Sequence, residues 1–63
     1  MNIGERIASI RRVKGITQQE LAENIGKERS VLSRYENGQV NISVDVAIKI
    51  ASALRVPIQR LIQ

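Results

Sequence analysis

The chain is 63 residues long and carries a formal net charge of +4, with ten lysines and arginines against six acidic residues. A chain of this length forms one domain, here residues 1–63, and buries only about 60% of the surface that its unfolded form exposes. Because cysteine and histidine are absent, disulfides and a Cys/His zinc site are excluded, and we expect no metal and no cofactor. The positive charge favours a polyanionic partner, nucleic acid before an anionic membrane surface.

The composition also bears on location and fold class. No apolar run approaches the roughly 20 residues that a membrane span needs, and no basic segment leads into an apolar one as in a signal peptide. We therefore expect a cytoplasmic protein that does not bind membranes. Phe and Trp are absent and Tyr occurs once, so the core must be aliphatic. This composition suits a compact helical bundle better than a small sheet, which favours aromatic and β-branched residues.

The first predicted helix runs from about Ile3 to Lys14. Asn2 and Glu5 have the spacing of a capping box at its start, and Gly15 can end it in the left-handed conformation. Gly4 weakens its first turn by up to about 1 kcal/mol relative to alanine. The apolar side chains that we expect on its inward face are Ile3, Ile7, Ile10 and Val13.

Two further helices follow, separated by a very short connection that contains Gly26. Thr17 and Glu20 form a second capping box, and the next helix spans about 28–36, before Gly38. Ala22 is small enough to let the two helices pack closely. The predicted inward residues are Leu21, Ala22, Ile25, Val31, Leu32 and Tyr35. Two capped helices around one glycine turn predict a helix-turn-helix.

The remainder of the chain predicts two more helices and hence an all-α fold of five short helices. Ser43 caps the fourth helix, and Asp45 complements its dipole. Pro57 fits the first turn of a short fifth helix. The buried stripe of the fourth helix is Val46, Ala47, Ile50, Ala51 and Leu54. The apolar residues Val56, Ile58, Leu61 and Ile62 either close the core or form a two-fold dimer contact.

The helix at 28–36 has a polar and basic side. Arg29, Ser30, Ser33 and Arg34 lie at i, i+1, i+4 and i+5 and therefore share one side of the helix. A helix fits the DNA major groove, where arginine pairs with guanine O6 and N7 and serine contacts several bases. The alternative is the solvated face that any small soluble helix carries, and periodicity alone favours neither interpretation.

Motifs along nearly the whole chain follow a known pattern. They are Ile10-Arg11, Gly15-Ile16-Thr17-Gln18, Glu20-Leu21-Ala22, Gly26, Ser33-Arg34-Tyr35-Glu36-Asn37-Gly38 and Ala51-Ser52-Ala53-Leu54. In this order they resemble the phage repressor and Cro-like helix-turn-helix family, also called the Xre family. The resemblance implies a lambda-repressor-like fold in which the second and third helices form the helix-turn-helix. It also implies DNA recognition by the third helix, with homodimers on palindromic operators.

The resemblance implies a role for individual residues. The residues expected to read bases are Arg29, Ser30, Ser33 and Arg34. Those expected to contact phosphates are Gln18, Lys27, Asn37, Gln39 and Asn41, and Gln18 should also steady the recognition helix. Arg11 and Glu36 resemble a structural ion pair. Three residues depart from the pattern: Glu28 stands where Ser or Thr often caps the third helix, Arg55 where glycine is common, and Ile42 where proline is usual. Glu28 suits the helix dipole but repels phosphates, or it accepts from a cytosine N4.

The predicted function is a sequence-specific double-stranded DNA-binding transcriptional regulator, a repressor that reads the major groove. The alternative is an antitoxin-like or protein-interaction module with the same fold. An enzyme is not expected, because Asp45 is the single aspartate and the glutamates are scattered over helix caps and solvated faces, without a pair suited to acid–base chemistry.

Overall fold

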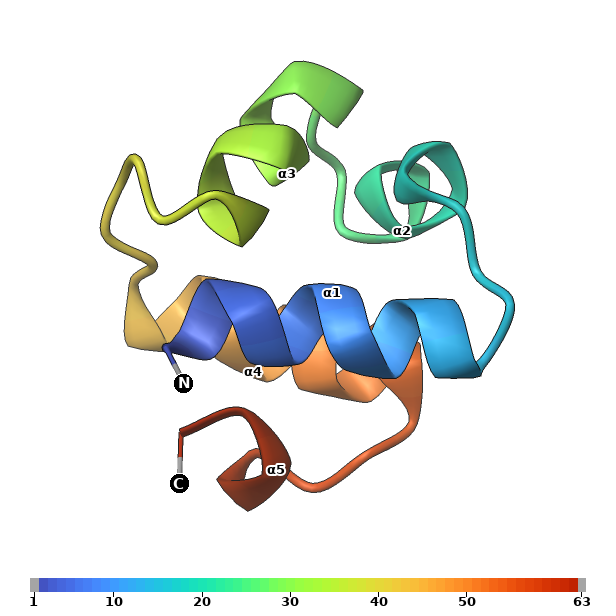
Figure 1. Ribbon diagram of the computed structural model, residues 1–63, viewed down its shortest axis with the longest axis vertical. Helices are drawn as coiled ribbons and strands as arrows, with labels where there is room; N and C mark the ends of the chain where they lie inside the picture. Colours follow the sequence, from blue (N-terminus) through green and yellow to red (C-terminus); the bar gives the residue numbers. More distant parts are fainter. Residues whose placement is uncertain (1, 63) are drawn as a thin grey trace.

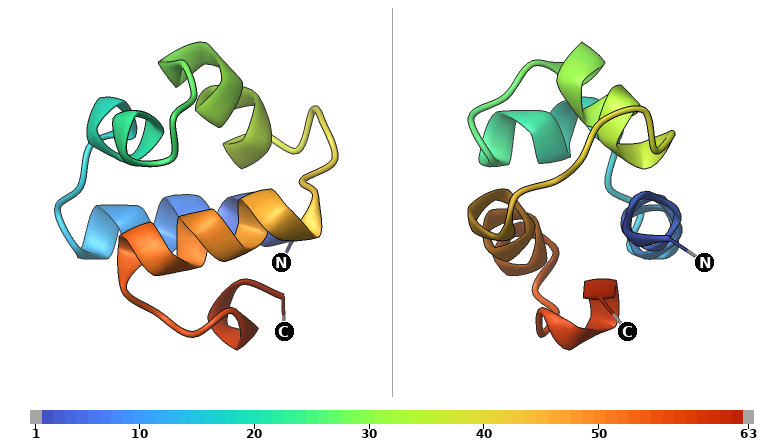
Figure 2. Two further views of the ribbon diagram at one scale, coloured as in Figure 1. Left: turned by 180° about the vertical axis from the view of Figure 1, so that it is seen from behind. Right: turned by 90° about the vertical axis from the view of Figure 1, so that its left-hand side faces the viewer.

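The computed structural model describes residues 2–62, which form five α-helices and no strand (Figure 1). The helices are α1 (Ile3–Val13), α2 (Gln18–Asn24), α3 (Arg29–Glu36), α4 (Val44–Leu54) and α5 (Gln59–Ile62). Helices α1 and α4 lie side by side in a middle layer, with α2 and α3 on one side of it and α5 on the other (Figure 2). The all-α fold of five short helices is therefore confirmed.

Local side-chain chemistry starts three of the helices. The Glu5 N–H donates to Asn2 Oδ1 at 2.8 Å, and the Glu20 N–H donates to Thr17 Oγ1 at 3.1 Å, so both predicted capping boxes are confirmed. The hydroxyl of Ser43 caps α4 in the same way. In return, the Thr17 backbone N–H, together with the Thr17 hydroxyl, lowers the pKa of Glu20.

Helix α5 starts later than the sequence predicts. Its first residue is Gln59, two residues after Pro57. Pro57 still contributes to this turn, because its carbonyl oxygen accepts from the Arg60 N–H at 3.0 Å. The prediction that Pro57 lies within the first helical turn is therefore wrong by two residues, although the proline does initiate the turn.

Every helix contributes to one aliphatic core. The fully buried large side chains are Ile7, Leu21, Leu32, Ile50, Leu54 and Leu61. Tyr35 is also buried, as predicted for an inward residue of α3. Ile3, Ile10, Val31 and Val46 pack against the core but are only partly buried.

The inward face predicted for α1 is wrong at Val13, whose side chain is 85% exposed. The buried residues of this helix are Gly4, Ile7, Ala8 and Arg11. With about 100° per residue, Val13 lies on roughly the opposite side of the helix from that group. The prediction failed because a glycine and an arginine do not look like core residues, so the apolar stripe was centred too far round the helix.

Gly4 allows α1 to touch the end of α3. It is buried, and a Cβ atom at this position would collide with the Tyr35 carbonyl oxygen and lie 3.0 Å from that of Glu36. Glycine at position 4 weakens the first turn of α1, but it is required because the backbones of α1 and α3 approach closely at this point.

Arg55 ends α4 in a conformation that normally favours glycine. Its φ and ψ are 60° and 45°, and within residues 2–62 no other non-glycine residue has a positive φ. The left-handed conformation costs an L-residue with a side chain roughly 1–2 kcal/mol. The turn after α4 is therefore strained, as the departure from the family pattern suggested.

No helix within residues 2–62 combines the length and the apolar character that a bilayer crossing requires.

Gly4→Ala should lower the free energy of unfolding by about 1–3 kcal/mol, because the overpacking cost exceeds the gain in helix propensity. Urea denaturation would measure this loss. Ser9→Ala, at an exposed position of the same helix, should change stability by less than about 0.5 kcal/mol. If Gly4→Ala were as stable as the wild type, the backbones of α1 and α3 would not be in close contact.

Arg55→Gly should raise the free energy of unfolding by about 0.5–1 kcal/mol, since the relief of backbone strain exceeds the extra entropy of glycine in the unfolded chain. Thermal melting would show an increase of several degrees. Arg55→Ala is the matched control because it removes the charge but keeps the Cβ atom. An equal gain in both variants would assign the effect to charge instead of strain.

Candidate nucleic-acid interface

Helices α2 and α3 are joined by a tight turn. Gly26 has a φ of +71°, and the Lys27 N–H donates a hydrogen bond to the Ala22 carbonyl oxygen at 2.9 Å. The Ala22 side chain is completely buried in the core. Gly26 thus lies in the predicted turn, and α3 packs across α2 (Figure 2).

Arg11 and Glu36 form a buried two-point ion pair between α1 and the last residue of α3. Arg11 Nε lies 2.7 Å from Glu36 Oε2, and Arg11 Nη2 lies 3.1 Å from Glu36 Oε1. The remaining guanidinium nitrogen, Nη1, donates to the Ile16 carbonyl oxygen at 2.9 Å. The side chains are 9% and 4% exposed, so the desolvation of both charges is offset by a full set of partners.

Gln18 extends this buried pair to the surface. Its Nε2 donates to Glu36 Oε1 at 2.9 Å, and its Oε1 accepts from Arg29 Nε at 3.3 Å. Glu36 is the last residue of α3 and Arg29 is the first. The side chain of one α2 residue therefore contacts both ends of α3, a geometry that suits the expected role of Gln18 in steadying that helix.

The residues expected to read bases lie on the outward side of α3. Arg29, Ser30 and Arg34 are exposed and Ser33 is half-buried, while Leu32 and Tyr35 face the core. Arg29, Ser30 and Ser33 line a surface hollow of about 280 Å³ together with Gln18. Arg34 does not line this hollow. The structure thus gathers three of the four predicted residues around Gln18.

The residues expected to contact phosphates lie beyond both ends of α3. Lys27 is exposed in the turn before it, and Gln39 and Asn41 are exposed in the connection after it. Asn37 is the C-cap of α3, where its backbone N–H donates to the Ser33 carbonyl oxygen at 3.0 Å. These residues therefore flank α3 along the chain, while Gln18 contacts it from α2.

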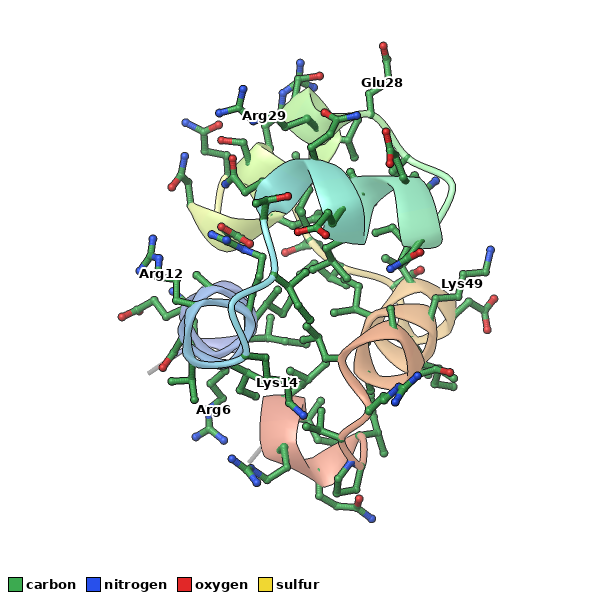
Figure 3. The ribbon with its side chains drawn as sticks, turned by 90° about the vertical axis from the view of Figure 1, so that its right-hand side faces the viewer. Arg6, Arg12, Lys14, Glu28, Arg29 and Lys49 are labelled. Atoms are coloured by element: carbon green, nitrogen blue, oxygen red, sulfur yellow. The ribbon has the colours of Figure 1, made fainter. Side chains whose placement is uncertain are left out.

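Arg12 is not among the residues that the sequence predicted to contact DNA. This exposed residue near the end of α1 lines a wide surface groove of about 750 Å³ that also includes Gln18, Gln19 and Arg29. Figure 3 shows Arg12 and Arg29 extending outward on the same side of the molecule. Adjacent residues of a helix point to different sides, so the burial of Arg11 leaves Arg12 on the exposed side. The Arg11-Arg12 pair could therefore have indicated Arg12 from the sequence.

Within the part of the chain that the structure describes, no three side chains of the His, Cys, Asp or Glu types come together as metal ligands.

Comparisons with known proteins agree with this arrangement. Residues 7–61 match the family described as Helix-turn-helix. The crystal structure of the restriction–modification controller protein C.AhdI from Aeromonas hydrophila is 36% identical, with a TM-score of 0.89 over 94% of this chain and 89% of that chain. The expected fold is thereby confirmed.

Two curated relatives are longer than this chain. The immunity repressor protein of Bacillus phage phi105 is 32% identical over 62 residues, which are 98% of this chain and 43% of the repressor. Antitoxin PezA of Streptococcus pneumoniae is 43% identical over 44 residues, which are 70% of this chain and 28% of the antitoxin. The chain thus spans less than half the length of either relative.

Arg11→Ala should destabilise the fold by about 3–5 kcal/mol, because it leaves the Glu36 carboxylate buried without its partner. Circular dichroism melting would detect this loss, and DNA binding should weaken mainly because less protein is folded. Arg12→Ala is the control for the melting measurement alone, since it removes the neighbouring arginine from an exposed site and should leave stability nearly unchanged. If Arg11→Ala melted like the wild type but lost DNA binding, Arg11 would instead contact DNA directly.

Proposed function

The chain belongs to the helix-turn-helix family of phage repressors and Cro-like regulators, and we propose that it is a sequence-specific transcriptional regulator, a repressor that binds double-stranded DNA. Residues 1–63 serve as a DNA-binding domain, which acts in the cytoplasm and carries out no enzymatic reaction. The observation that carries the proposal is the polar and basic outer face of α3, which Gln18 connects to the buried ion pair of Arg11 and Glu36. A recognition surface requires this kind of support, because base contacts depend on the fixed position of the helix.

Affinity comes from contacts to phosphates on both sides of α3. Lys27 lies before the helix, and Asn37, Gln39 and Asn41 lie after it. Gln18 is close enough to Arg29 to share the same stretch of DNA backbone. We add Arg12 to this set, because it lines the same groove as Gln18 and Arg29. Each cationic contact releases counterions, so affinity falls as salt rises.

Specificity comes from α3 in the major groove. Arg29 and Arg34 pair with guanine O6 and N7, while Ser30 and Ser33 adjust to neighbouring bases. Arg29 already donates through Nε to Gln18, which leaves its two terminal nitrogens for a base or a phosphate. The bound orientation of this arginine is therefore partly set before DNA arrives.

A homodimer on a palindromic operator completes the proposal. Two copies would place their recognition helices about 34–36 Å apart, one turn of DNA. The apolar residues near the C-terminal end divide between two roles. Leu61 is 1% exposed and closes the core, whereas Ile62 is 61% exposed. Ile62, together with the half-buried Val56 and Ile58, is the candidate for a two-fold contact between copies.

The similarity to PezA favours one second candidate, an antitoxin-like module that binds a protein partner. The two functions differ in their ligand. Selective duplex binding by the purified chain supports the regulator, whereas capture of a protein partner without duplex binding supports the antitoxin-like module.

A binding selection on random duplex DNA tests the proposal directly. It should return a palindromic site with half-sites one helical turn apart. With about four cationic phosphate contacts in a dimer, Lys27 and Arg12 from each copy, the slope of log affinity against log salt should be about −4. Enrichment of no sequence, or an affinity almost independent of salt, would contradict a sequence-specific regulator.

Arg29→Ala and Arg34→Ala should each weaken specific binding by about 1–3 kcal/mol and relax the base preference at particular positions. Titrations against the selected site and against single-base variants would measure both effects. Arg60→Ala, an exposed arginine on α5, the helix furthest from α3 (Figure 1), is the control. An equal loss on every sequence would make Arg29 and Arg34 phosphate contacts only.

A further inference from the structure

Glu28 holds an unusual place at the start of the recognition helix. It is the N-cap of α3, and its carbonyl oxygen accepts from the N–H groups of Val31 and Leu32 at 3.0 and 3.2 Å. Its side chain makes no capping hydrogen bond. Asn2, Thr17 and Ser43 all use their side chains to cap a helix. Glu28 therefore caps α3 through its backbone alone, and its carboxylate remains exposed.

Within residues 2–62, no lysine or arginine forms an ion pair with this carboxylate, and the ion pair of the structure is the one between Arg11 and Glu36. The neighbouring Arg29 donates through Nε to Gln18, toward α2. In Figure 3 the Glu28 side chain extends away from the body of the protein, at the same end as Arg29. A negative charge thus stands free at the tip of a surface that is otherwise polar and basic.

Such a charge opposes DNA binding unless it finds a donor. Phosphates repel a carboxylate, and the oxygens and N7 atoms of bases offer it no hydrogen. The donors in the major groove are the amino groups of cytosine and adenine, and an acidic side chain is suited to cytosine N4. A duplex that presents this amino group to the tip of α3 compensates the charge, while other sequences leave it near phosphates without a partner.

We propose that Glu28 is a specificity-determining residue, which accepts a hydrogen bond from a cytosine N4 amino group and disfavours duplexes that lack it. The inference rests on the proposed function and deepens it. Arg29 and Arg34 favour the correct duplex by forming hydrogen bonds with it. Glu28 acts mainly by weakening the binding of duplexes that lack the cytosine amino group. Its removal should therefore increase non-specific affinity while it reduces discrimination.

Glu28→Gln and Glu28→Ser test this inference by binding selection and by titration against the selected site and its single-base variants. Both variants keep the fold, because no side-chain hydrogen bond is lost, and serine adds a cap that should raise the melting temperature by a few degrees. One cytosine preference of the wild type should disappear in Glu28→Ser and weaken in Glu28→Gln. The lost discrimination should be about five- to 150-fold, the range for one mismatched base pair, and affinity for unrelated duplexes should rise.

Glu23→Gln is the matched control, since it removes the same charge from an exposed site on α2. It should leave every base preference unchanged. If Glu28→Gln and Glu28→Ser increased affinity equally for all sequences, as a general loss of repulsion would, the inference would be overturned while the regulator proposal stood. If the wild type itself enriched no sequence, both would fail.

Discussion

The buried ion pair between Arg11 and Glu36 is the interaction on which the rest of the structure depends. It joins the middle layer to the end of the recognition helix, and Arg11 also holds the segment before α2 through the Ile16 carbonyl oxygen. Within residues 2–62, no buried side-chain nitrogen or oxygen lacks a partner. A shift of either helix that broke these contacts would leave a buried charge without compensation, so the pair constrains how α3 packs on α1.

The position of α3 is consequently fixed at both ends by different means. At its C-terminal end, Gly4 permits backbone contact with α1 and Glu36 forms the ion pair. At its N-terminal end, the Gly26 turn and the hydrogen bond between Gln18 and Arg29 hold the first residue against α2. A helix of 8 residues has little stability of its own. Its neighbours supply the stability and leave one face free.

The free face of α3 and its surroundings carry charges of both signs. The exposed Arg12 and Lys27 suit a phosphate backbone, while Glu28 sets a single negative charge at the tip of α3. An all-basic tip would bind many duplexes well. The combination instead suits a protein that must reject a large excess of non-specific DNA, where the ratio of affinities matters more than either affinity alone.

Local chemistry allowed much of this protein to be predicted from its sequence. Capping boxes, the turn at Gly26 and the shared side of Arg29, Ser30, Ser33 and Arg34 each depend on residues a few positions apart, and the structure retains all of them. The likeness of its motifs to a known family predicted the Arg11–Glu36 pair, which spacing alone could not.

Tertiary structure decided what depends on distant neighbours. The inward side of α1 carries Gly4 and Arg11 instead of Val13, because α3 supplies a backbone oxygen for one to approach and a carboxylate for the other to bind. The link from Glu36 through Gln18 to Arg29 also exists only once α2 crosses α3. The sequence by itself determined the helices, the turn and the candidate recognition face. Only packing determined which side of α1 is buried and how α3 is held, since both require atoms far apart in the chain to meet.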